Sequence, residues 1–210
     1  MNRVQRYSFA VFLSFAVSSL TNAQTGGNQL LSSKDAVVID QALGISFLKP
    51  GQAVRQGNNG YEFSLQSSSG NIRQAVASIL ISQKPSVDLS GTYGGRLSLD
   101  APEARRLLEN VVKVDTIVLR GLVFRRELWA VYAGMGAWEG VVNCYALRNN
   151  QYYNLCLNVG VNAGKPGETE GGEAVSAKAL QARVAGVLTD AREPVIQQFN
   201  SLLSSFQLNQ

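Results

Sequence analysis

The chain has 210 residues, of which 45% are hydrophobic and 16% charged, and its formal net charge is +4. It contains no histidine, which excludes Ser-His-Asp and Cys-His nucleophilic catalysis and removes the commonest zinc ligand. Its Lys and Arg residues are scattered rather than gathered into a stripe, so we do not expect nucleic-acid binding.

Residues 1–23 have the three parts of a secretory signal peptide. Arg3 and Arg6 supply the positive start, residues 7–17 form a short apolar run, and small residues end the segment at Ala23. The run is well short of the roughly 20 residues that cross a bilayer, so no stable membrane anchor is expected. We predict an exported protein, periplasmic or secreted, that is cleaved after Ala23. Cleavage leaves 17 basic and 15 acidic residues, a net charge of +2.

The segments that follow differ in character. We expect residues 24–34 to form a flexible N-terminal segment and residues 35–210 to form a single α+β domain. Three early strands are predicted from branched and alternating residues, at 44–48, 61–66 and 74–82. The third is so rich in Ala, Val and Ile that it is typical of a central strand buried on both faces.

The middle of the domain predicts a loop and then a helix. Residues 90–96 are rich in glycine, which favours a loop. Asp100, Pro102 and Glu103 have the spacing of a helix start, and the helix should extend to about residue 112. Its inward side is expected to consist of Leu107, Leu108, Val111 and Val112.

The second half of the domain alternates strands and helices. Strands are predicted at 115–119 and 122–132, a strand hairpin at 138–147 and 152–161, and helices at 173–189 and from Pro194 onward. The last helix carries an apolar stripe at helical spacing, made of Ile196, Phe199, Leu202, Leu203 and Phe206. Runs of strands that helices interrupt and close favour an α+β sandwich around a mainly antiparallel sheet.

Cys144 and Cys156 lie in the two strands of the predicted hairpin. A three-residue loop at 149–151 would place them directly opposite each other, and export would favour a structural disulfide. In that register Tyr145 and Leu147 face the core. A two-residue loop would shift the pairing by one and put the cysteines on opposite faces, where no bridge forms. We expect a structural disulfide rather than a redox pair. Two free buried thiols are the remaining alternative.

Aromatic residues concentrate in the same hairpin and the strand before it. If the face away from the core exposes Trp138 and Tyr152, these residues and Arg125 form a candidate recognition surface. Catalysis by two carboxylates stays open in principle, and Glu127 and Glu139 are the pair to inspect. Alternatively, both glutamates are solvent-facing strand residues. We predict no catalytic motif, no cofactor site and no metal site.

Several segments together resemble one known family. They are residues 44–50 (Gly-Ile-Ser-Phe-Leu-Lys-Pro), 121–126 (Gly-Leu-Val-Phe-Arg-Arg), 152–155 (Tyr-Tyr-Asn-Leu) and the amphipathic 199–206. From about residue 35 to 208 the chain resembles the PsbP-like family, which includes the extrinsic photosystem II protein and the bacterial DcrB-like envelope proteins. The resemblance implies an α/β/α sandwich without a shared catalytic motif, whose members act as binding or assembly accessories.

These observations lead to a ranked set of functions. The first expectation is a non-enzymatic exported accessory protein that binds another envelope or secreted protein. An inhibitor or immunity protein against a secreted toxin or hydrolase is a second version of protein binding. A carrier that holds a lipid or other apolar ligand between helix and sheet is the alternative from a different class.

Overall fold

The computed structural model describes residues 37–50, 52–67, 70–170 and 173–209. The predicted signal peptide, residues 1–23, and the predicted flexible segment, residues 24–34, lie outside these ranges. All described residues belong to the second of the two units into which the chain divides, Ser32–Gln210.

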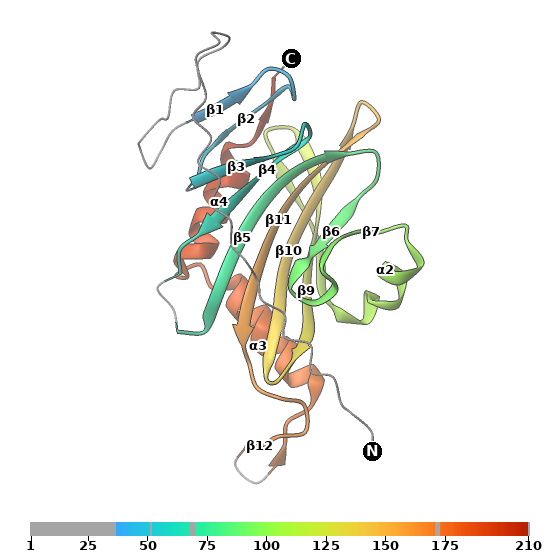
Figure 1. Ribbon diagram of the computed structural model, residues 1–210, viewed down its shortest axis with the longest axis vertical. Coiled ribbons are helices and arrows are strands. Elements are labelled where there is room, and N and C mark those ends of the chain that lie inside the picture. Colours follow the sequence, from blue (N-terminus) through green and yellow to red (C-terminus); the bar gives the residue numbers. More distant parts are fainter. Residues whose placement is uncertain (1–36, 51, 68–69, 171–172, 210) are drawn as a thin grey trace, which may run out of the picture. The chain divides into compact units, whose positions relative to one another are not determined.

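A seven-stranded sheet organises this unit, and every neighbouring pair of its strands is antiparallel (Figure 1). In spatial order the strands are β3 (Gln52–Gln56), β4 (Gly60–Leu65), β5 (Ile72–Ser82), β11 (Gln151–Asn162), β10 (Ala137–Arg148), β9 (Leu122–Gly134) and β8 (Val111–Leu119). The strand predicted at 74–82 is β5, an inner strand whose Ala77 and Ile79 are fully buried. The predicted α+β fold with a mainly antiparallel sheet is therefore confirmed.

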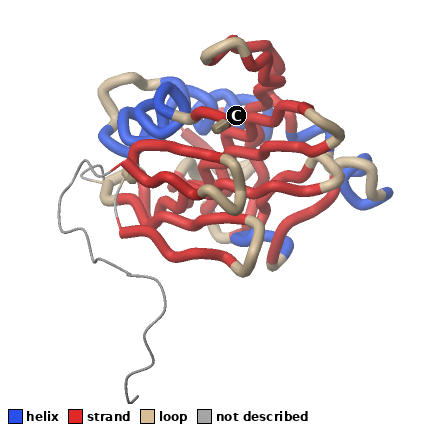
Figure 2. Tube along the Cα trace, turned by 90° about the horizontal axis from the view of Figure 1, so that it is seen from above, coloured by secondary structure: helices blue, strands red, loops and turns tan. Residues whose placement is uncertain are grey.

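Two long helices, α3 (Ala177–Thr189) and α4 (Pro194–Ser205), lie on the same side of this sheet (Figure 2). The apolar stripe predicted for the last helix is buried, which confirms its assignment to the core. The helix predicted from 173 begins later, because Ser176 Oγ accepts a hydrogen bond from the Ala179 amide at 3.2 Å and caps it. Residues 173–174 instead form β13 (Glu173–Ala174), which pairs with β12 (Thr169–Glu170).

A small sheet closes the end of the helical layer. It consists of β1 (Val37–Asp40), β2 (Ile45–Leu48) and β14 (Gln207–Leu208), in the order β1-β2-β14. The strand predicted at 44–48 is confirmed as β2, whose Phe47 packs edge-on against Tyr61 and Phe63. The C-terminal strand thus returns to the first strands of the domain.

The opposite face of the large sheet is covered in part by a second layer. This layer is a hairpin with short helical turns: β6 (Ser86–Leu89), α1 (Ser90–Tyr93), β7 (Gly95–Ser98), α2 (Pro102–Arg106) and η1 (Leu108–Asn110). Val87, Leu89 and Leu107 of the layer join Trp129 and Val141 of the sheet in a second apolar cluster. The loop predicted at 90–96 contains α1 and the start of β7.

The helix predicted at 100–112 is wrong in length. It ends at Arg106, its N-cap is Ala101 without a side-chain cap, and Leu108 is 56% exposed rather than inward. Val111 already belongs to β8, where it pairs with Trp129. Branched valines favour a strand, and pairing with β9 overrides the helix-start signal.

The β10–β11 hairpin closes with two residues, Asn149 and Asn150, whose φ angles are 51° and 60°. Left-handed backbone at both positions is typical of a type I′ turn, and asparagine tolerates it better than most residues. Arg148 therefore pairs with Gln151. This loop is one residue shorter than the one that the disulfide requires.

The predicted disulfide is consequently wrong. Cys144 lies opposite Leu155, while Cys156 lies opposite Asn143, so the two side chains point to different faces of the sheet. Both thiols are free and buried, as in the alternative interpretation. Burial raises the pKa of the Cys144 thiol to about 12, which keeps it protonated.

Candidate recognition surface

A row of polar side chains crosses the sheet face that lies opposite the long helices. Register places Glu127, Asn143, Cys156 and Ser78 side by side on four neighbouring strands, and all four are buried. The amide atoms of Asn143 have no hydrogen-bond partner among the described residues. A purely apolar core does not require buried polar side chains of this kind. The face opposite the long helices therefore differs in chemical character from the face beneath them.

Strand β6 covers this row where it crosses β10 and β11. The Ser86 amide donates to Asn154 Oδ1 at 3.0 Å, and Asn158 Nδ2 donates to the Asp88 carbonyl at 3.2 Å. These two contacts fix β6 along β11 from residue 154 to residue 158. Beyond Asn154, toward the hairpin turn, the same face continues without this cover.

Glu127 connects the buried row to the uncovered part. Its Oε1 accepts hydrogen bonds from Arg125 Nε at 2.8 Å and from the Tyr145 hydroxyl at 3.1 Å, and its Oε2 accepts one from Trp129 Nε1 at 3.2 Å. The Glu127 side chain is 5% exposed, whereas that of Arg125 is 54% exposed. A buried carboxylate thus holds a surface guanidinium in one orientation.

The same network sets the protonation of its members. The hydrogen bond to Glu127 raises the pKa of Arg125. Burial, together with the neighbouring Glu127 charge, raises the pKa of Tyr145 to about 12. At neutral pH Arg125 is therefore a fixed positive charge and Tyr145 a hydrogen-bond donor.

Exposed aliphatic side chains surround Arg125 on this uncovered part of the face. We call the set the open patch, and it consists of Arg125, Tyr145 and Tyr152 with Val114, Val118, Val123 and Leu147. Val118, Val123, Leu147 and Val114 are 66%, 60%, 57% and 44% exposed. Register puts them on one face, because Val118 pairs with Val123 and Leu147 with Tyr152. The rings of Tyr145 and Tyr152 lie 6.4 Å apart.

The structure brings two of the three predicted recognition residues together. Arg125 and the half-buried Tyr152 both belong to the open patch. Trp138 does not, because it is 2% exposed on the helical face, where it packs against Tyr132 and donates to the Gly164 carbonyl at 2.9 Å. The prediction for Trp138 is wrong.

Sequence reasoning missed Tyr145, Leu147 and the valines of the patch. The three-residue loop assigned Tyr145 and Leu147 to the core, and the two-residue loop turns the first hairpin strand over. A signal for the shorter loop was present in Asn149 and Asn150.

Glu127 and Glu139 do not form a catalytic pair. Both are buried rather than solvent-facing, and Glu139 lies opposite Val131, four residues along β9 from Glu127. Four residues correspond to about 13 Å along the strand, which exceeds the separation of about 5 to 10 Å found in glycoside hydrolases. The buried Trp129 lies on the same face between them, and Glu139 accepts a hydrogen bond from Asn158.

The described ranges contain neither a cluster of metal ligands nor a helix suited to span a membrane. Among these residues no group of three or more Cys, Asp or Glu side chains is placed to hold a metal ion. No helix within the same ranges combines the length and apolarity needed to cross a membrane.

Comparisons with known proteins give a likeness of fold. No protein-family model matches the chain, and no curated protein matches it. Among solved structures it is similar to cyanobacterial PsbP from Synechocystis, with 11% identity and a TM-score of 0.35 over 87% of this chain and 98% of that chain. This agrees with the fold-level resemblance drawn from the sequence.

Two other solved structures show a similar degree of likeness. The Ran-binding protein Mog1p of Saccharomyces cerevisiae has 8% identity and a TM-score of 0.42 over 83% of this chain and 95% of its own. A crystal structure from Bacteroides thetaiotaomicron has 10% identity and a TM-score of 0.41 over 85% of this chain, which spans half the length of that protein. The likeness in all three cases is one of fold.

Proposed function

We propose that the protein is a non-enzymatic, exported binding protein that recognises a protein partner through the open patch. The observation that carries this proposal is the cluster of exposed valine and leucine side chains around Arg125 on an uncovered part of the sheet. Single exposed apolar residues are ordinary, but contiguous ones surrounded by polar groups mark interaction sites.

The composition of the open patch suits a protein partner. Tyrosine and arginine are enriched where proteins bind each other, since they bring large contact area and hydrogen-bond donors together. Arg125 is already oriented by Glu127, so little side-chain freedom would be lost on binding. The matching surface should carry a carboxylate or carbonyl oxygen beside apolar side chains.

Absence of catalytic chemistry supports the non-enzymatic part of the proposal. The chain has no histidine, and its best-placed carboxylates, Glu127 and Glu139, are buried and separated along the sheet. Export rests on residues 1–23 alone. A toxin or hydrolase as the partner would make the protein an inhibitor, which loss of that enzyme's activity on binding would reveal.

The test compares matched charge insertions in the full chain. Leu147→Glu and Val123→Glu alter the open patch, and Val54→Glu is the control, because Val54 is equally exposed at 58% on β3. Tagged proteins are recovered from the envelope or secreted fraction of the source cells. We expect one partner with the wild type and with Val54→Glu, reduced at least about tenfold by either patch variant. Equal recovery with all variants would contradict the proposal, and thermal unfolding shows that each is folded.

A further inference from the structure

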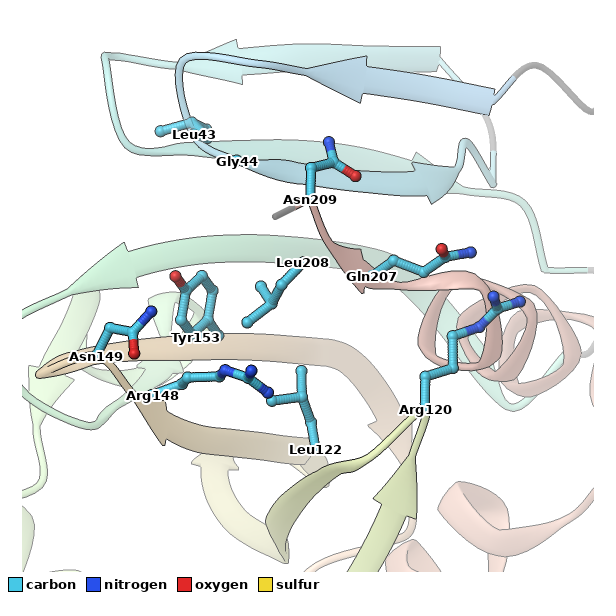
Figure 3. A pocket seen from close by; sticks show the side chains of 10 residues that line it. All are labelled: Leu43, Gly44, Arg120, Leu122, Arg148, Asn149, Tyr153, Gln207, Leu208 and Asn209. Carbon is cyan, nitrogen blue, oxygen red and sulfur yellow. The ribbon is translucent and has the colours of Figure 1, made fainter.

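A cavity of about 340 Å³ lies at the hairpin end of the large sheet, apart from the open patch (Figure 3). We propose that it binds a small amphiphilic anion, a molecule that carries a carboxylate or phosphate group on an apolar chain. The volume falls within the range of about 300 to 1,000 Å³ that is usual for small-molecule sites. The proposal does not depend on the protein partner proposed above, because no residue of the open patch lines this cavity.

Turn geometry brings two arginines to this end of the sheet. Arg120 and Gly121 form the two-residue turn between β8 and β9, and Asn149 and Asn150 form the corresponding turn between β10 and β11. Alternate turns of an antiparallel sheet lie at the same end. Arg120 and Arg148 therefore reach the same cavity from two hairpins.

The C-terminal segment completes the cavity on its other side. The Asn209 amide donates to the Gly44 carbonyl at 2.8 Å, and Asn209 Oδ1 accepts from Ser46 Oγ at 3.0 Å. These contacts hold Leu208 over the hairpin turns. Figure 3 shows Arg148 extending beneath Leu208 toward Leu122, and Arg120 rising toward Gln207.

The lining is positively charged. Arg120 and Arg148 are its two charged residues, and no acidic side chain is among the described lining residues. The Arg148 side chain makes no ion pair or hydrogen bond within the described ranges, and Arg120 uses its Nε to donate to the Ser204 carbonyl at 3.1 Å. Two like charges beside one cavity attract an oxyanion, and guanidinium groups bind carboxylate and phosphate by paired hydrogen bonds.

The remaining lining has a polar part, made of Asn149, Gln207 and Asn209, and an apolar part. Leu122 and Tyr153 are buried, and Leu43 and Leu208 complete that part of the surface. Such residues favour a ligand whose charged group is attached to an apolar chain. Of these lining residues, Leu43 donates its amide hydrogen bond to the buried Asp40. Asp40 also accepts a hydrogen bond from the Tyr61 hydroxyl.

The cavity and the open patch use neighbouring residues on opposite faces. Leu122 lines the cavity and Val123 belongs to the patch, and Arg148 and Leu147 are related in the same way. Because successive side chains of a strand alternate, ligand and protein partner contact different sides of the same strand ends.

The test uses amide chemical shifts of the isotopically labelled full chain during titration. The probes are hexanoate, hexyl phosphate, hexanol and inorganic phosphate. We expect saturable shifts at Leu122, Arg148 and Asn209 with hexanoate or hexyl phosphate, and weaker binding of hexanol and inorganic phosphate. The tighter of the two charged amphiphiles identifies the anionic group.

Two arginine variants test whether the positive charge of Arg148 contributes to ligand binding. Arg148→Gln removes no side-chain hydrogen bond or ion pair within the described ranges, so the variant should fold normally and bind the amphiphile about tenfold more weakly. Arg73→Gln, which changes an exposed arginine at the other end of β5, should leave the affinity unchanged. The proposal is overturned if neither charged amphiphile gives saturable shifts, if hexanol binds as tightly, or if Arg148→Gln has no effect.

Discussion

Cys144 and Cys156 lie on neighbouring strands but point to opposite faces of the sheet. Cys144 belongs to the core beneath the long helices, and Cys156 belongs to the apolar cluster beneath β6. Their separation follows from the number of residues in the turn at Asn149 and Asn150. One further turn residue would bring the sulfur atoms to the same face.

The cysteines provide a test of this register. Under native conditions we expect neither thiol to react with iodoacetamide, because both are buried and burial raises the pKa of each. After unfolding without reductant, intact-mass measurement should show two alkylated thiols. A chain that takes up no alkyl group after unfolding would contain the disulfide and would contradict the register.

Asp115 gives a second test at single residues. Its carboxylate accepts two hydrogen bonds from Arg126, at 2.7 and 2.6 Å, which lowers its pKa from 3.8 to about 2. A lowered pKa in the folded state stabilises the protein above the unfolded pKa, and this stabilisation is lost as the pH falls from about 4 to about 2. Asp115→Asn should therefore lower the free energy of unfolding by about 1 kcal/mol near neutral pH.

Urea unfolding of wild type and Asp115→Asn across the acid range measures this effect. The difference between the two proteins should shrink toward zero as the pH approaches 2. Asp100→Asn serves as the control, because Asp100 is exposed and lies 3.9 Å from Lys84. A difference between wild type and Asp115→Asn that does not change with pH would rule out the ion pair as its cause.

Helix α3 lies directly on strand β10 at Gly140. A Cβ atom at that position would come within 3.0 Å of Val184 Cγ1 and 3.2 Å of Leu188 Cδ2, both on α3. Glycine here allows the helix to approach the sheet closely. The glycine is thus a packing residue rather than a turn residue.

Two glycine substitutions should have opposite effects on stability. Gly140→Val should lower the free energy of unfolding by about 1 to 3 kcal/mol, because the core has no room for the added side chain. Gly186→Ala within α3 meets no atom within 4 Å and should raise it by about 0.5 to 1 kcal/mol. Chemical denaturation measures both. Loss of stability in both variants, or in neither, would contradict the packing described for α3.

Element types were more predictable than their connections. The strands at 44–48 and 74–82 and the apolar stripe of the last helix follow from local periodicity, and the structure confirms them. The helix at 100–112 fails because pairing of β8 with β9 is a long-range interaction that local signals do not contain. The predicted three-residue hairpin loop is wrong because it overlooks the two-residue turn that the consecutive residues Asn149 and Asn150 favour.

At the scale of the whole domain, the two faces of the large sheet differ in what covers them. Long helices bury one face, while the other carries a polar row under β6 and the open patch beyond it. Their chemistry singles out Arg125 and Tyr152 in the sequence, and both lie in the open patch. Val123 and Leu147 could not be singled out in this way, because an apolar strand residue is normally core and its exposure depends on where β6 ends.

Site-specific photocrosslinking tests the central claim that the open patch contacts a protein partner. A photoreactive amino acid replaces Leu147 in one version of the full chain and Val54 in another, four strands away, about 19 Å across the sheet. On irradiation in the cells that produce the protein, we expect one discrete adduct from position 147 and none from position 54. Equal adducts from both positions, or an adduct from position 54 alone, would contradict the assignment of the open patch as the binding surface.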